Sequence, residues 1–222
     1  MRNNQEYKNA SLAALKGNWA PSIVATIVLM AVTYVGPYIV VYELTLNSIP
    51  VNPIVALVSV ALYLLAMPLL FMPLNLGYTY AANRLYVEGD NGLIGNMFRD
   101  GLGRWFRKGW TVFLMGFFTS LWSLLLIVPG IIKFYAYSMT PYILIDNPEL
   151  SANQAINLSR DMMKGHKFDY FWLCLSFIGW IFLGMLTLGI GYFWLIPYMY
   201  TTYAAFYQDI KADYEAKVNL NN

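Results

Sequence analysis

The sequence contains few charged residues. Lys, Arg, Asp and Glu together make up 12% of its 222 residues, whereas they make up about 25% of an ordinary soluble domain. Hydrophobic residues make up 59%, against roughly 45 to 50% in soluble proteins. This composition excludes an ordinary water-soluble domain and predicts a protein with much of its surface in membrane hydrocarbon. The net charge of +2 is too small to indicate nucleic acid as a partner.

Cysteine and histidine are almost absent. The single cysteine, Cys174, excludes an internal disulfide and a cysteine-based metal site. The single histidine, His166, has one nearby carboxylate, Asp169, whereas a metal site needs three or four ligands. No second histidine and no Ser-x-Gly motif are present to activate a hydroxyl nucleophile. We therefore expect no metal, no cofactor and no enzymatic activity.

Long apolar runs alternate along the chain with short Gly/Pro breaks or longer charged loops. A membrane-spanning helix needs about 20 apolar residues, and six runs come close to that length. Because Gly and Pro end helices, short breaks such as Pro129-Gly130 are expected to turn pairs of helices into hairpins. We predict an all-α polytopic membrane protein: a single integral membrane domain, residues 1–222, with six transmembrane helices in three hairpins. The predicted spans are residues 23–41, 54–74, 110–128, 131–145, 170–187 and 190–206.

An amphipathic segment precedes each hairpin, and we expect these segments to lie as helices at the membrane interface. The predicted interfacial helices are residues 5–17, 93–108 and 151–164. In the second, apolar residues recur at helical spacing, although Gly101 and Gly103 weaken the helix and mark where it can split in two. The third begins at Ser151, followed three residues later by Gln154, which is the pattern of a capping box.

Basic residues on these segments predict contacts with anionic lipid headgroups, because each Lys or Arg near the surface adds about 1 kcal/mol of attraction. The predicted lipid-contacting residues are Arg99, Arg104, Trp105, Arg107, Lys108, Lys164 and Lys167. With six spans, thirteen of the 14 Lys and Arg residues fall on one side of the membrane. The positive-inside bias places that side, with both termini, in the cytoplasm.

Two polar residues lie within or beside predicted spans. Lys133 is the one basic residue on the far side, and it either extends its ammonium to the interface or faces a pore or an anionic ligand. Asn75 follows Pro68 and Pro73, so it either lines a substrate-binding break in the helix or packs in a kink against a neighbouring helix. No Asp or Glu lies deep in a predicted span, which argues against an ion-coupled pump.

Several stretches resemble a known family of bacterial integral membrane proteins. They are ALKGNW at 14–19, PLNLGYTY at 73–80, WSLLLIVPGIIKFYAYSM at 122–139 and the run that begins YILIDNPELSANQAINLSRDMMKGHKFDYFW at 142. The family is DUF975, a domain of unknown function, and the resemblance extends from about Ala14 to Ile210. It implies a multi-pass protein of the bacterial cytoplasmic (inner) membrane and no particular reaction. More distantly, the layout is similar to the membrane domain of some glycerophosphodiester phosphodiesterases, whose catalytic barrel has no counterpart in these 222 residues.

Three functional hypotheses are compatible with these features. The first is a non-enzymatic membrane protein that binds anionic lipids and a membrane-protein partner, in envelope homeostasis or as an accessory to export or resistance. The alternative is a carrier or pore for a small amphiphile or peptide, for which Lys133 and the broken spans argue. A lipid-processing enzyme rests only on His166 and on four loop carboxylates, Asp146, Glu149, Asp161 and Asp169.

Overall fold

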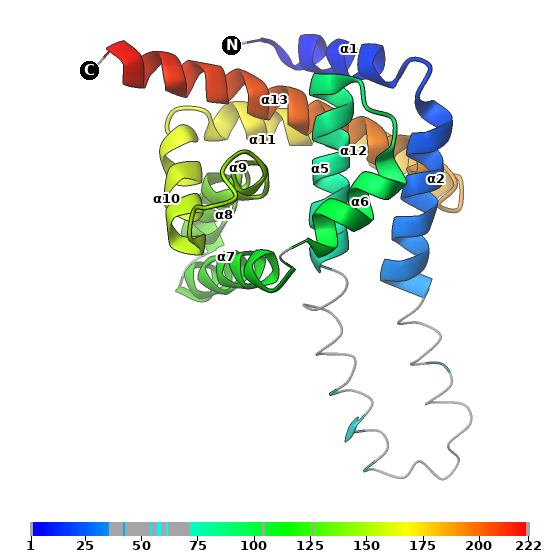
Figure 1. The fold of residues 1–222 in the computed structure, drawn as a ribbon, viewed down its shortest axis with the longest axis horizontal. Coiled ribbons are helices and arrows are strands. Elements are labelled where there is room, and N and C mark those ends of the chain that lie inside the picture. Colours follow the sequence, from blue (N-terminus) through cyan, green and yellow to red (C-terminus); the bar gives the residue numbers. More distant parts are fainter. Residues whose placement is uncertain are drawn as a thin grey trace.

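The computed structural model describes residues 2–35, 72–103, 105–125 and 127–220, together with residues 42, 54, 57, 58 and 61. The elements in these ranges are all helical, as predicted, and no β-strand occurs among them. The predicted second span lies almost entirely outside the described residues. The helices of Figure 1 are α1 (Asn4–Leu15), α2 (Trp19–Met30), α5 (Met72–Glu88), α6 (Leu93–Leu102), α7 (Trp105–Leu125), α8 (Ile127–Tyr137), α9 (Thr140–Asp146), α10 (Ala152–Met162), α11 (Lys167–Leu175), α12 (Ile178–Leu186) and α13 (Tyr192–Leu220).

A sharp elbow joins α1 to α2. α1 begins with a capping box in which Asn3 and Glu6 exchange hydrogen bonds of 2.8 and 2.9 Å. The chain then bends by 98° at Gly17, whose φ of +84° is a left-handed conformation that favours glycine. Figure 1 shows α1 lying across the top of the molecule and α2 descending from its end. One π-helical turn, η1 (Ala31–Val35), extends α2.

The glycine-rich crossing of α5 and α6 forms a tight hairpin. A Cβ added to Gly77 would lie 2.0 Å from the carbonyl oxygen of Met97, and one added to Gly101 would lie 2.6 Å from that of Pro73. Met97, expected on the membrane side of an interfacial helix, is instead fully buried in a cluster with residues of α5. The predicted helix 93–108 is also two helices, because α6 ends in an extended Gly103 and α7 follows. Part of its apolar face therefore packs on protein rather than on lipid.

The helix break predicted at Pro129-Gly130, between the third and fourth predicted spans, does not occur, because these residues are helical. α7 ends at Leu125 and α8 begins at Ile127, so Pro129-Gly130 lies in the first turn of α8. The prediction of a helix break at Pro129 was wrong for a physical reason. A proline in the first turn sacrifices no helical hydrogen bond, because the N–H groups there have no partner within the helix.

The fourth and fifth predicted spans are both interrupted. The fourth is divided between α8 and α9, where Ser159 of α10 donates to the carbonyl of Ala136 at 2.9 Å and accepts from the N–H of Met139 at 3.2 Å. The fifth is divided between α11 and α12 by a turn at Ser176, whose carbonyl accepts from the ammonium of Lys8 at 2.9 Å. Each break is therefore bound by a polar side chain of another helix.

The long helix α13 joins the sixth predicted span to the C-terminal tail. It has 29 residues and contacts α1, α2, α5, α10 and α12. Its buried residues Ala204, Ala205 and Phe206 belong to a core cluster that also contains Tyr7 of α1. Figure 1 shows α13 alongside α1 and across α5, so the two ends of the chain pack together.

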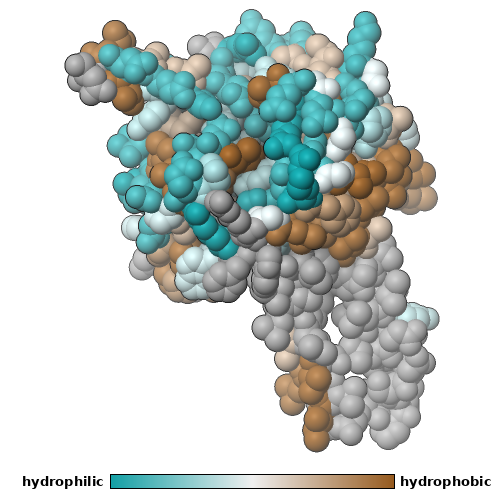
Figure 2. All heavy atoms as spheres, viewed as in Figure 1, coloured by the Kyte–Doolittle hydropathy of each residue, from teal (hydrophilic) through white to brown (hydrophobic). Residues whose placement is uncertain are grey.

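Candidate membrane spans are few among the described residues. The segment Lys167–Leu186 is long and apolar enough to cross a membrane, and the bent pair Asn4–Leu15 and Trp19–Thr33 brings the number to two if it counts as one span. The surface is nonetheless segregated: Figure 2 shows hydrophilic residues over the upper part of one face and hydrophobic residues along its lower right edge. On α7, exposed Trp110, Phe113 and Phe117 form a stacked aromatic stripe, which is unfavourable in water.

Candidate functional site

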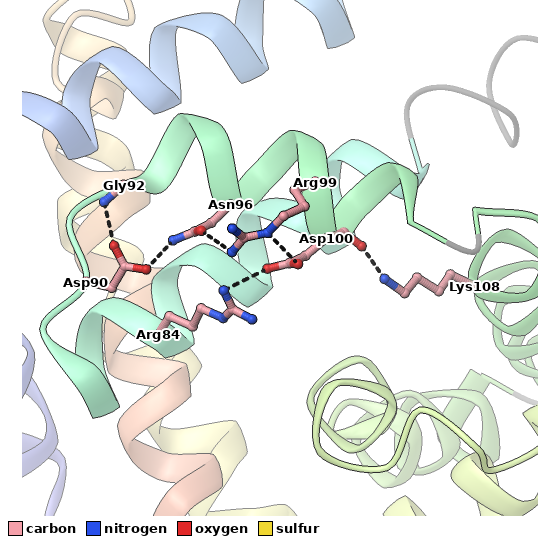
Figure 3. A network of polar contacts seen from close by, with 7 residues as sticks. All are labelled: Arg84, Asp90, Gly92, Asn96, Arg99, Asp100 and Lys108. Atoms are coloured by element: carbon pink, nitrogen blue, oxygen red, sulfur yellow. Dashed lines mark hydrogen bonds and ion pairs between the residues drawn. The ribbon is translucent and has the colours of Figure 1, made fainter.

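A network of polar side chains runs along the α5–α6 hairpin to the start of α7 (Figure 3). It begins at the turn, where the carboxylate of Asp90 accepts from the N–H of Gly92 at 2.9 Å and from Nδ2 of Asn96 at 2.8 Å. These two donors lower the pKa of Asp90, the Gly92 amide first. Asn96 Oδ1 in turn accepts from Nη2 of Arg99 at 2.6 Å, so contacts that begin at the turn fix the position of the Arg99 side chain.

Three cations gather around Asp100 in the middle of this network, two at its carboxylate and one at its backbone carbonyl. Arg99 Nε lies 3.4 Å from Oδ1 of Asp100, and Arg84 Nη1 lies 3.4 Å from Oδ2. Lys108, at the start of α7, donates to the backbone carbonyl of Asp100 and its ammonium lies 4.6 Å from the centroid of the Tyr80 ring. We call Arg84, Arg99, Lys108 and Asp100 the basic cluster. Three positive charges face one negative charge in it.

The basic cluster is partly open to solvent. The side chain of Arg99 is 64% exposed and that of Arg84 is 31% exposed, whereas the side chain of Asp100 is only 19% exposed. The cations thus lie on the outer side and the carboxylate lies beneath them. Such an arrangement attracts anions, and guanidinium groups present paired donors that fit carboxylate or phosphate oxygens. The described residues contain no group of three His, Cys, Asp or Glu side chains able to hold a metal ion.

The structure brings together two of the predicted lipid-contacting residues and separates the others. Arg99 and Lys108 meet at Asp100, whereas Arg107 donates to the carbonyl of Leu150, ahead of α10. Arg104 and the side chain of Trp105 lie outside the described residues. Farther away, Lys164 pairs with Asp161 at 2.9 Å and Lys167 is the half-buried first residue of α11.

The two predicted intramembrane polar residues lie elsewhere in the fold. The ammonium of Lys133 lies 4.8 Å from the ring centroid of Trp122 and 5.9 Å from that of Tyr137, so aromatic faces surround part of its charge. Asn75 is half-buried in the first turn of α5, and its backbone carbonyl accepts from the hydroxyl of Thr79 at 3.1 Å.

A second set of polar contacts, on α13, was not predicted. Asp146, at the end of α9, accepts from the hydroxyl of Tyr207 at 2.7 Å and from Nζ of Lys211 at 2.6 Å. The spacing of 207 and 211 on one helical face was the signal available in the sequence.

Further contacts join α13 to the N-terminal segment and to the start of α11. Asp209 accepts from the hydroxyl of Tyr7 at 2.6 Å and from the backbone N–H of Arg2 at 3.1 Å. His166 Nε2 lies 3.1 Å from Asp213, which also pairs with Lys217. The lysine and the histidine lower the pKa of Asp213, the lysine first. These groups connect helices, and the contact with Asp213 joins His166 to α13.

Comparison with known proteins gives one match. The model of the family described as a protein of unknown function, DUF975, matches residues 103–214, a shorter region than the resemblance predicted from the sequence. No curated protein and no solved structure matches the chain. The matched region begins between α6 and α7 and ends within α13. Because it covers half of the sequence, the chain belongs to the DUF975 family of proteins of unknown function.

Proposed function

We propose that the protein is a non-enzymatic, multi-pass protein of the bacterial cytoplasmic membrane that binds anionic lipid headgroups at its cytoplasmic surface. The observation that carries this proposal is the basic cluster, in which three cations gather around Asp100 and the side chain of Arg99 is 64% exposed. In this proposal six helices span the bilayer and both termini are cytoplasmic. The low charge content of 12% and the separation of polar and apolar surface in Figure 2 support it.

A protein of this kind acts through binding rather than through chemistry. Its proposed role is in envelope homeostasis or as an accessory to export or resistance, with a membrane protein as partner. The layout of the sequence is also similar to the membrane domain of some glycerophosphodiester phosphodiesterases, and this similarity supports a protein that works among lipids. Two of the four loop carboxylates, Asp146 and Asp161, are paired with lysines, which supports binding rather than catalysis.

The test is lipid binding by the full chain. Protein purified in detergent is mixed with phosphatidylglycerol or with zwitterionic phosphatidylethanolamine, and bound lipids are counted by native mass spectrometry. We expect a preference for phosphatidylglycerol, which the double variant Arg99→Gln, Lys108→Gln weakens at least several-fold, because each cation contributes about 1 kcal/mol. The control, Arg160→Gln, Lys217→Gln, removes the same charge from α10 and α13. Equal binding of both lipids by the wild-type protein would refute the proposal.

A carrier or pore is the second candidate, and the position of Lys133 favours it. A lysine held by the rings of Trp122 and Tyr137 can exchange those contacts for an anionic or aromatic solute. In cells with equal protein levels, Lys133→Ala should then change susceptibility to amphiphilic compounds, whereas Lys133→Arg, which keeps the charge, should not. If both variants behave as wild type across a broad panel of compounds, the carrier hypothesis fails.

A further inference from the structure

Asp100 pairs only loosely with the cations around it. Its carboxylate oxygens lie 3.4 Å from the nearest nitrogens of Arg99 and Arg84, whereas a charge-assisted hydrogen bond measures about 2.7 to 2.9 Å. Its Oδ2 is buried and has no hydrogen-bond partner among the described residues. The two guanidinium groups therefore retain much of their capacity to bind another anion.

A second unsatisfied group lies beside the same cations. The side chain of Tyr80 is buried, with 3% of the residue exposed, and its hydroxyl has no hydrogen-bond partner in the described part of the chain. The ammonium of Lys108 contacts both the Tyr80 ring and the Asp100 backbone carbonyl, so the aromatic ring and the backbone of Asp100 border the same positive charge. A phenolic O–H is a donor, and leaving it without an acceptor costs free energy.

The missing partner is therefore an acceptor with more than one oxygen and a negative charge. A phosphodiester has these properties, and arginine forks bind it in the bidentate manner that suits Arg84 and Arg99. We propose that Arg84, Arg99, Lys108 and Tyr80 form a specific site for the phosphodiester of an anionic phospholipid, and that Asp100 is its internal competitor. This inference rests on the proposed function and adds the site and its control to it.

If Asp100 competes with the lipid for these cations, removing its charge should raise the affinity for phosphatidylglycerol, whereas removing a cation should lower it. Asp100→Asn removes the carboxylate that pairs with Arg84 and Arg99, and the full chain should bind phosphatidylglycerol about fivefold more tightly, the effect of one like charge at about 4 Å in water. Asp213→Asn is the matched control, because Asp213 also lies between two basic side chains, Lys217 and His166, but on α13. Its affinity for phosphatidylglycerol should equal that of the wild type.

The readout is again native mass spectrometry in detergent, with circular dichroism to establish that each variant is helical. If Asp100→Asn does not fold, Asp100→Ser provides a second neutral side chain at this position. Equal affinities of the neutral variant, Asp213→Asn and the wild type would overturn the inference. The proposed function would still stand if the double variant Arg99→Gln, Lys108→Gln binds less phosphatidylglycerol than the wild type.

A second arm distinguishes a lipid from a soluble phosphate compound. The same proteins are titrated with inorganic phosphate in place of phosphatidylglycerol. A gain in Asp100→Asn for the lipid without a comparable gain for inorganic phosphate supports a headgroup site. A gain for inorganic phosphate alone would assign the site to a soluble phosphate compound and overturn the lipid assignment.

Discussion

At the scale of single residues, Lys8 shows how a buried cation joins distant parts of the chain. It is 8% exposed, its ammonium donates to the carbonyl of Ser176 at 2.9 Å, and it lies 4.4 Å from the centroid of the Phe177 ring. That carbonyl belongs to the end of α11, where a cation is favoured by the helix dipole. Burial lowers the pKa of Lys8, so the Ser176 carbonyl and the Phe177 ring are what stabilise its charged form.

Replacing Lys8 with methionine should destabilise the protein. Lys8→Met keeps the apolar stem but removes the donor to Ser176, and we expect the free energy of unfolding to fall by about 1 to 2 kcal/mol. Lys16→Met, at the exposed end of α1, should change it by less than about 0.5 kcal/mol. Unfolding in sodium dodecyl sulfate, followed by circular dichroism, measures both. Similar losses in the two variants would contradict the importance of the buried contact.

Residue contacts of this kind could not be predicted from the sequence. Lys8 and Ser176 are 168 positions apart, and Tyr7 and Asp209 are 202 apart, so no local pattern relates them. Local signals performed better: the capping box of Ser151 and Gln154 is confirmed. Sequence analysis predicted lipid contacts for Arg99 and Lys108, but it did not include Arg84 in the site because the pairing of α5 with α6 is a tertiary contact.

At the scale of elements, the amphipathic pattern of α6 did not reveal what its apolar face contacts. Lipid and protein interior are both apolar, so the same periodicity fits either. Gly77 and Gly101 decide the matter by letting the backbones of α5 and α6 approach closely. The break at Gly103, in contrast, follows from backbone preferences and could be predicted. The error at Pro129 arose because a proline ends a helix only when it lies beyond the first turn.

Alanine at Gly77 should disrupt the α5–α6 hairpin. The added methyl group would lie 2.0 Å from the Met97 carbonyl oxygen, and overpacking of this kind costs typically 1 to 3 kcal/mol. Gly95→Ala is the control on α6, because nothing lies within 4 Å of its added Cβ, and alanine there should be neutral or stabilising by up to about 1 kcal/mol. Unfolding titrations that rank Gly77→Ala as the more stable variant would contradict the close crossing.

The turn between α5 and α6 should depend on pH through Asp90. Hydrogen bonds from Gly92 and Asn96 lower its pKa in the folded state, so its stabilising contribution is complete above the unfolded pKa of about 3.9. That contribution disappears as the pH falls through the lower folded pKa. Asp90→Asn should therefore be less stable than wild type at pH 6, and the two should converge once the pH has fallen below the lowered folded pKa of Asp90. A stability difference between Asp90→Asn and the wild type that persists in acid would show that the loss of stability comes from the shape of the side chain rather than from the missing charge.

At the scale of the whole molecule, the contact between the chain ends limits the topology. α1 packs on α13, and Arg2 and Tyr7 both hydrogen-bond to Asp209. In the proposed membrane topology, Arg2 and Asp209 lie on the same side because they are in direct contact, which requires an even number of spans between them. The six spans and the positive-inside distribution predicted from the sequence satisfy this condition.

Cysteine labelling in intact cells tests the proposed topology. In a Cys174→Ser background, a membrane-impermeant maleimide should label Leu188→Cys, at the turn between α12 and α13, where the native residue is 94% exposed. It should not label Glu88→Cys, at the exposed end of α5, until the cells are opened. Labelling of Glu88→Cys in intact cells would invert the orientation.

The many polar contacts of α13 have a consequence for biosynthesis. Partners on α1, α5 and α9 are translated long before Tyr207, Gln208 and Asp209 leave the ribosome. Until then Asp146 and Asn83 lack their partners on α13. The nascent chain is therefore incompletely folded and exposed to quality-control proteases. Truncation within the final helix should therefore shorten the lifetime of the whole protein rather than remove a dispensable tail.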